Sequence, residues 1–304
     1  MTLVRGVEAL RWRSAGPAAG TAAVATLWGT SGVVVRHIDL SAVQIAGGRA
    51  AVGALALTVW LLSPAGRRHR RLQAGRWSAS ITSGVLLAAH WWTFTLALQR
   101  ISIGTVLLGI YLAPLMITAL ARHTLGETVT GRQVAALGLA MAGAVLIFQP
   151  DQAGGWGGVA LIGFSAAAYA GSILASKRVL LTAAPLALSA VQLGVVAVLL
   201  VPVSMAEPLV VHGGDLARIA VLGVVYSAAA QLIYLRCLRK LPAVTSGILL
   251  YLEPVSALIS GWLLLSETPT AATVCGALLI LLAGGAISYR EATAHRTSGR
   301  ANNR

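Results

Sequence analysis

Three ionisable side chains stand inside long apolar stretches of this sequence. Glu253 precedes Pro254 in one such stretch, and Arg49 and His90 each lie in the middle of another. An ionisable group inside a membrane costs roughly 3 kcal/mol on insertion scales and usually marks a functional site. Glu253 is therefore interpreted as a carboxylate that binds a substrate ammonium group or exchanges a proton for substrate. The alternative is a structural acid that bonds a neighbouring helix.

The two other groups leave a choice between function and packing. Arg49 is the eighth residue of the apolar run 42–63. It can pair with Glu253, bind a substrate carboxylate, or hold two helices together through backbone carbonyls; the structural interpretation is favoured because a permanent cation is hard to cycle. His90 can relay protons, because histidine titrates near neutral pH. A hydrogen-bonded residue of the bundle is the plainer alternative for His90.

Aromatic side chains accompany these groups at the same depth in the apolar runs. Tryptophan and tyrosine that anchor a helix in a bilayer lie at its ends. These lie nearer the centre, which favours the lining of a cavity for an amphipathic solute over interface anchoring; core packing is the alternative. With Glu253 and His90, the expected substrate-binding set comprises Trp28, Trp91, Tyr111, Tyr169, Tyr251 and the neutral hydrogen-bonding Gln231.

The composition indicates that lipid is the solvent of this chain. Its 304 residues are 57% hydrophobic and 11% charged, and the mean hydropathy is +0.80, beyond what a soluble domain needs. The net charge of +14 comes from residues in short gaps between apolar runs, so it indicates membrane topology rather than nucleic-acid binding. Cys237 and Cys275 show no metal-ligand spacing, and we expect neither a metal nor a cofactor.

Apolar runs of about 20 residues, long enough to span a bilayer, recur along the whole chain. They predict an all-α membrane protein with ten transmembrane helices at 16–35, 42–63, 77–98, 102–121, 132–149, 156–176, 185–204, 216–236, 243–264 and 271–289.

The basic residues predict how these spans are oriented. With a cytoplasmic N-terminus, nineteen of the 23 lysines and arginines fall on the cytoplasmic side, and only Arg36, Arg100 and Arg218 fall on the other. Cytoplasmic loops carry such an excess. We therefore expect a multi-pass protein of the plasma (inner) membrane with both termini in the cytoplasm.

The second half of the chain repeats the first. Tyr111-Leu-Ala-Pro114 recurs 140 residues later as Tyr251-Leu-Glu-Pro254, and Ser41-Ala-Val-Gln44 recurs as Ser189-Ala-Val-Gln192. The expected units are a first repeat at 1–150, a second at 151–290 and a disordered cytoplasmic tail at 291–304. Five spans is an odd number, so the two copies must enter the membrane in opposite directions. Inverted repeats are a construction of transporters.

Two features of the repeat concern single residues. Pro114 and Pro254 each remove a backbone donor, so they are either hinges or static kinks. Glu127 and Glu267 follow the two proline-containing spans, and we expect them to be structural caps near the positive N-terminal ends of the next helices.

The repeated motifs also resemble the two EamA repeats of the drug/metabolite transporter superfamily. The resemblance is carried by Pro114…Leu125-Gly-Glu127, Glu253-Pro254…Leu265-Ser-Glu267, Trp28-Gly-Thr-Ser31, Arg49 and His90-Trp91-Trp92. It implies ten helices in two inverted five-helix repeats, and export of amino acids or other small metabolites. The first copy departs from the second at Ala113, which replaces the carboxylate, so any chemistry of Glu253 is asymmetric between the halves.

A secondary transporter that exports a small metabolite by alternating access is thus the expected function, with a proton as a candidate coupling ion. The alternative is an integral-membrane enzyme or a channel-like facilitator. The acids are scattered singly and form no catalytic set, no ring of like groups indicates a channel, and no phosphate-binding glycine loop is present. The expected partners are the metabolite, the lipid bilayer and no nucleic acid, with the protein a monomer or homodimer.

Overall fold

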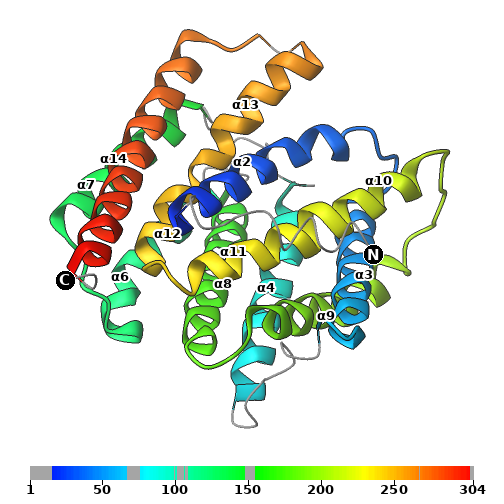
Figure 1. The fold of residues 1–304 in the computed structure, drawn as a ribbon. Coiled ribbons are helices and arrows are strands. Elements are labelled where there is room, and N and C mark those ends of the chain that lie inside the picture. The colour runs from blue at the N-terminus through cyan, green and yellow to red at the C-terminus, as the bar shows by residue number, and fades with distance from the viewer. Residues whose placement is uncertain are drawn as a thin grey trace.

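The chain folds into packed helices (Figure 1). The structure, a computed structural model, describes residues 16–66, 76–98, 100, 106, 109–147, 155–266 and 268–301, and all their regular secondary structure is helical. In chain order the helices are α2 (Pro17–Val35), α3 (Ala42–Leu62), α4 (Trp77–Leu98), α6 (Ala113–Leu125), α7 (Gly131–Ile147), α8 (Gly155–Leu180), α9 (Pro185–Ser204), α10 (Asp215–Val221), the π-helix η3 (Leu222–Ala229), α11 (Ala230–Leu238), α12 (Ala243–Leu250), α13 (Leu252–Leu265) and α14 (Ala271–Ala301).

Six helical stretches in the described part of the chain are long and apolar enough to cross a membrane. They coincide with the first, second, sixth, seventh, eighth and ninth expected spans, and shorter apolar helices occupy the fifth and tenth. Described helical residues also lie in the third and fourth expected spans. The protein is thus an all-helical, multi-pass membrane protein, while the crossing of the bilayer by all ten spans stays a prediction.

The two prolines of the repeat lie next to breaks in their helices. The expected ninth span consists of α12 and α13, which meet at Tyr251. Pro254 has no N–H and its ring collides with the carbonyl of the residue four positions earlier, so one continuous helix is disfavoured here. In the first half, Tyr111 and Leu112 form a turn directly before α6, which contains Pro114 in its first turn.

The expected disordered tail needs a correction. Helix α14 continues to Ala301, through most of the segment 291–304. Residues 290–301 contain no proline and include alanine, glutamate and arginine, which favour helix. Extension of an existing helix also avoids the cost of nucleating a new one.

Contacts between the two halves build the interior. Helix α4 packs on α8, α3 on α9, α7 on α14, and α2 on both α13 and α11; Figure 1 shows α2 lying between the last two. The largest core cluster includes the buried Tyr111 and Tyr251. Gly29 lets α2 approach α13, because a Cβ at this position would lie 1.9 Å from Ser256 Oγ. This packing places the start of α13, with Glu253, inside the bundle.

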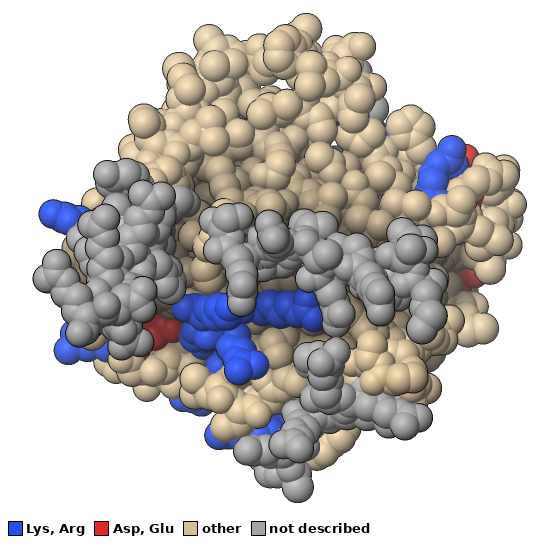
Figure 2. Space-filling model, viewed as in Figure 1, with Lys and Arg blue, Asp and Glu red and all other residues tan. Residues whose placement is uncertain are grey.

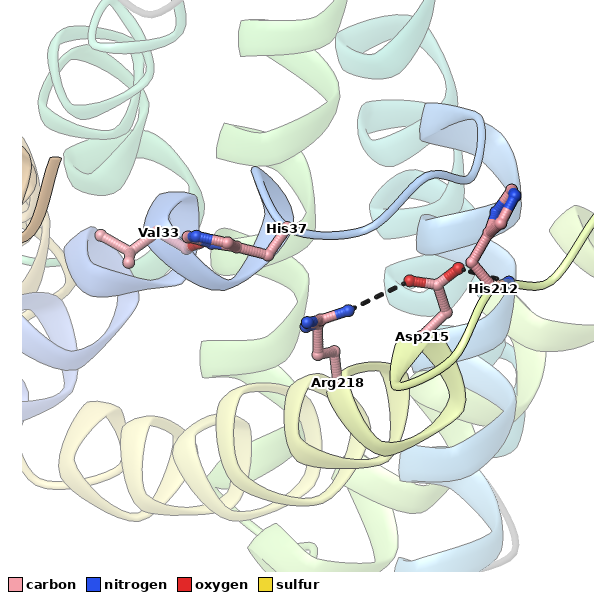
Figure 3. Close-up of polar contacts among 5 residues, drawn as sticks. All are labelled: Val33, His37, His212, Asp215 and Arg218. Atoms are coloured by element: carbon pink, nitrogen blue, oxygen red, sulfur yellow. Dashed lines mark hydrogen bonds and ion pairs between the residues drawn. The ribbon is translucent and has the colours of Figure 1, made fainter.

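Charged side chains are unevenly distributed over the described surface (Figure 2). At the start of α10, the buried Asp215 accepts a hydrogen bond from the His212 N–H at 3.0 Å and pairs with Arg218 at 3.4 Å, and His37 lies nearby at the end of α2 (Figure 3). The top of the molecule in Figure 2 shows no charged side chain among the described residues. Leu263 on α13 is 66% exposed, as expected for a surface that faces lipid.

Candidate functional site

Glu253 lies in the first turn of α13, directly after the helix break. Its side chain is half-buried, and it is close enough to Arg49, Tyr111 and Tyr169 to interact with them electrostatically. Within the described part of the chain, no hydrogen bond or ion pair engages its carboxylate. The carboxylate is thus held in the bundle without a direct partner among the described residues, as a group that binds a solute or a proton would be.

Arg49 is held by two neighbouring helices. Its Nε donates to Ser227 Oγ on η3 at 2.9 Å, and its guanidinium carbon lies 4.9 Å from the centre of the Trp91 ring on α4. The contact is a side-chain hydroxyl rather than the backbone carbonyls that we considered. Ser227 was not expected, and a single serine in an apolar run gives no sequence signal.

His90 joins α4 to α8. Its Nδ1 lies 3.0 Å from Ser165 Oγ, and its ring stacks on Tyr169 with centroids 4.6 Å apart. The side chain is buried. His90 therefore contacts one of the residues near Glu253 while its own polar atom is hydrogen-bonded, which leaves both interpretations of this histidine open.

Tyr111 and Tyr251, which are equivalent in the repeat, contact each other. Their ring centroids are 5.1 Å apart, and the Tyr251 hydroxyl donates to the Tyr111 carbonyl oxygen. The pair is thus a contact between the two halves of the chain, and Glu253 follows two residues after Tyr251.

Trp28 and Gln231 contact residues that we had not selected. The Trp28 Nε1 donates to the Tyr226 carbonyl at 2.8 Å, and its ring lies 5.5 Å from that of Tyr234. Gln231 Nε2 donates to Gln192 Oε1 at 3.1 Å.

Gln192 is a buried polar residue that we did not select from the sequence, although the sequence contains a signal for it. It is buried and donates to Ser83 Oγ at 3.2 Å and Ser176 Oγ at 2.8 Å. Its place in the recurring Ser-Ala-Val-Gln stretch was used only as a marker of the repeat. A glutamine in the middle of an apolar run was a usable signal, because buried amides need partners.

The structure also contains a cavity of about 500 Å³, but it lies away from these residues. It is bounded by α7, α12 and α14, and none of the expected site residues lines it; Arg132, Gln133 and Thr245 do. A cavity lined by the expected substrate-binding residues stays a prediction. No group of three metal-ligating side chains occurs among the residues that the structure describes.

Helices of this length and hydropathy, packed around a sparse set of buried polar groups, define a multi-pass membrane protein. A family model described as the EamA-like transporter family matches residues 18–149 and again 156–289. The chain belongs to this family of membrane transporters, as its motifs predicted.

Two further comparisons agree with this assignment. An uncharacterized transporter, YwfM, of Bacillus subtilis (strain 168) is 27% identical over 272 residues, covering 85% of this chain and 88% of that protein. A protein of known crystal structure has a TM-score of 0.76 at 19% identity, covering 89% of this chain and 96% of that one. The second likeness concerns the fold alone.

Proposed function

We propose that this protein is a secondary transporter that exports a small metabolite, such as an amino acid, by alternating access around a site at Glu253. The observation that carries the proposal is the carboxylate of Glu253, which lies near the contact of Tyr111 with Tyr251 and has no direct partner among the residues that the structure describes. In this proposal the protein lies in the plasma (inner) membrane with both termini in the cytoplasm.

The pattern of helix contacts supports two inverted five-helix repeats. In the repeat, α2 corresponds to α8, α3 to α9, α4 to η3 with α11, and α6 to α13. Helix α4 packs on α8, and the equivalent helices of the other half, α11 and α2, also pack on each other. Likewise, α4 packs on α9, and the equivalent pair, η3 and α3, is in contact. A two-fold relation between the halves requires such pairs, and inverted halves of this kind can rock around a central site.

The groups near Glu253 favour a solute with an amine. A carboxylate in a low-dielectric site attracts an ammonium strongly, and Tyr111 and Tyr169, which are close enough to interact with it electrostatically, carry apolar rings. Arg49 is also close enough to Glu253 for an electrostatic interaction, and we propose that it binds a substrate carboxylate. A proton and an ammonium compete for the same carboxylate, so the entry of one releases the other.

The experiment has two steps. Metabolite profiles of the medium of cells with and without the protein identify an exported solute. Transport of this solute is then measured in proteoliposomes with and without a pH gradient. We expect Glu253→Gln to abolish the stimulation by the gradient and to lower transport at least tenfold, because a neutral amide binds neither the proton nor the ammonium with comparable strength.

Asp39→Asn is the matched control, because this acid is exposed at the end of the bundle; it should transport like the wild type. A Glu253→Gln protein that keeps both its rate and its pH-gradient dependence would refute the role of Glu253.

A further inference from the structure

Two charged side chains bind backbone groups of residues 238–243, where α11 ends and α12 begins. They are Glu127, which follows α6, and Lys177, near the end of α8. We propose that Glu127 acts as a latch that fastens the first half to this connection of the second half, and that Lys177 holds the connection in place on α8. The solute path opens on this side only when the latch releases. The latch rests on the alternating access proposed above.

Glu127 caps a helix of the opposite half. The N–H of Ala243, the first residue of α12, donates to its Oε1 at 2.9 Å and its Oε2 at 2.8 Å. The N-cap of α12 is Pro242, which makes no side-chain capping bond, so this buried N–H has no partner in its own helix. We expected Glu127 near the start of the next helix, α7. The structure instead places its carboxylate at the positive end of α12, where a negative charge is favourable.

Lys177 binds the other end of the same segment. Its ammonium donates to the carbonyl oxygens of Leu238, at 2.7 Å, and Leu241. Both leucines are buried, and the last carbonyls of a helix have no partners within it. A cation is favourable at this negative helix end. The two side chains therefore complete the hydrogen bonding at both sides of one tight connection.

The latch crosses between the halves. Glu127 belongs to the first repeat, whereas Lys177 and residues 238–243 belong to the second. The Glu127 bond therefore joins the halves, and the Lys177 bonds lie within the second half. Arg178 adds a further bond of the same kind, from its Nε to the Thr124 carbonyl at the end of α6, at 2.8 Å. In Figure 2, basic side chains gather at the lower left of the molecule with an acidic one beside them. Separation of the halves at this end must free the buried Ala243 N–H from Glu127, so it is costly but reversible.

Amide hydrogen exchange of the segment 238–246 in nanodiscs tests the latch directly, because exchange reports local opening. We expect Glu127→Ala and Lys177→Met each to accelerate exchange of this segment about tenfold or more, with no change in α9. Cys237, which is 2% exposed next to the segment, gives a second readout in a Cys275→Ser background. A water-soluble maleimide should label Cys237 slowly in the wild type and faster in both variants.

Three controls separate the latch from a general loss of stability. Arg122→Gln changes an exposed charge in the last turn of α6 and should change neither readout. Lys177→Arg keeps the donors and should restore slow exchange. The double variant Glu127→Lys/Lys177→Glu should stay as open as the single variants, because it places each charge at the wrong helix end. If the two side chains acted only as an ion pair, the swap would restore that pair and exchange would be slow again.

Unchanged exchange and labelling in both single variants would overturn the latch, as would rescue by the charge swap. Neither readout requires a substrate. A protein that opens as described but moves no solute would contradict the proposed function and leave the latch standing. Conversely, active transport with no effect of Glu127 or Lys177 on exchange would contradict the latch alone.

Discussion

At position 49 a guanidinium lies between an indole ring and a serine hydroxyl. The Trp91 ring lies 4.9 Å from its central carbon and Ser227 Oγ 2.9 Å from its Nε. Cation–π contacts that are shielded from water stabilise by up to about 2 kcal/mol. Arg49 therefore has a structural task in joining α3, α4 and η3, whatever it contributes to solute binding.

A double-mutant cycle measures the energetic coupling between Arg49 and Trp91. We expect Arg49→Met and Trp91→Leu each to lower the free energy of unfolding in mixed detergent, with a coupling of about 0.5–2 kcal/mol between them. Arg49→Lys should recover only part of the loss, because an ammonium lacks the planar stacking surface and the Nε donor. Arg132→Met, at an exposed position in the first turn of α7, is the control. A coupling near zero would show that the stacked geometry contributes no stability.

The sequence could identify the residues that are costly in a membrane, but not their partners. Glu253, Arg49 and His90 were found because each contradicts the apolar run around it. Ser165 and Ser227 were missed because a serine costs little in an apolar helix and its partner is set by tertiary packing. Glu127 was predicted to cap the next helix, α7, but it caps α12 instead. The sequence could not show this, because α12 is distant in sequence and adjacent only in the fold.

At the scale of helices, close packing depends on a few glycines. Gly29 on α2 faces α13 so tightly that a Cβ would lie 2.2 Å from the Glu253 carbonyl oxygen. Small residues at helix contacts allow such approach in membranes. The position of Glu253 in the bundle therefore depends in part on the absence of a side chain at position 29.

Gly29→Ala should force α2 and α13 apart and lower the free energy of unfolding by about 1–3 kcal/mol, the usual cost of overpacking. Gly32→Ala is the matched control on the same helix, because nothing lies within 4 Å of a Cβ at that position. It should be neutral or slightly stabilising, since alanine favours helix over glycine. Thermal unfolding of the purified variants compares them, and equal midpoints would contradict the tight contact.

Helix positions were largely predictable, because hydrophobic length is a strong signal, but irregularities within helices were not. The break at Tyr251 follows from Pro254, whose effect on a helix is known. The π-helix η3 has no such signal: Leu222–Ala229 contains no proline, and its widened turn depends on packing. The extension of α14 to Ala301 was missed because the polar tail was interpreted by composition alone.

At the scale of the whole molecule, the two halves meet at equivalent residues and exchange equivalent helix contacts. The contact of Tyr111 with Tyr251 and the paired packing of helices support an internal two-fold relation. The odd number of expected spans in each half then requires opposite insertion. Such an arrangement can expose one site to either side of the membrane in turn.

Accessibility of position 253 from the two sides of the membrane tests this account most directly and needs no known substrate. The variant Glu253→Cys, in a background with Cys237→Ser and Cys275→Ser, is treated with an impermeant maleimide in right-side-out and in inside-out vesicles. Tyr169→Cys serves as a second position in the same site, and Leu263→Cys, which is 66% exposed on the same helix, serves as the lipid-facing control. We expect labelling of positions 253 and 169 from both sides and of position 263 from neither. Labelling of positions 253 and 169 from one side only, or from neither, would contradict a central site that the two halves expose in turn.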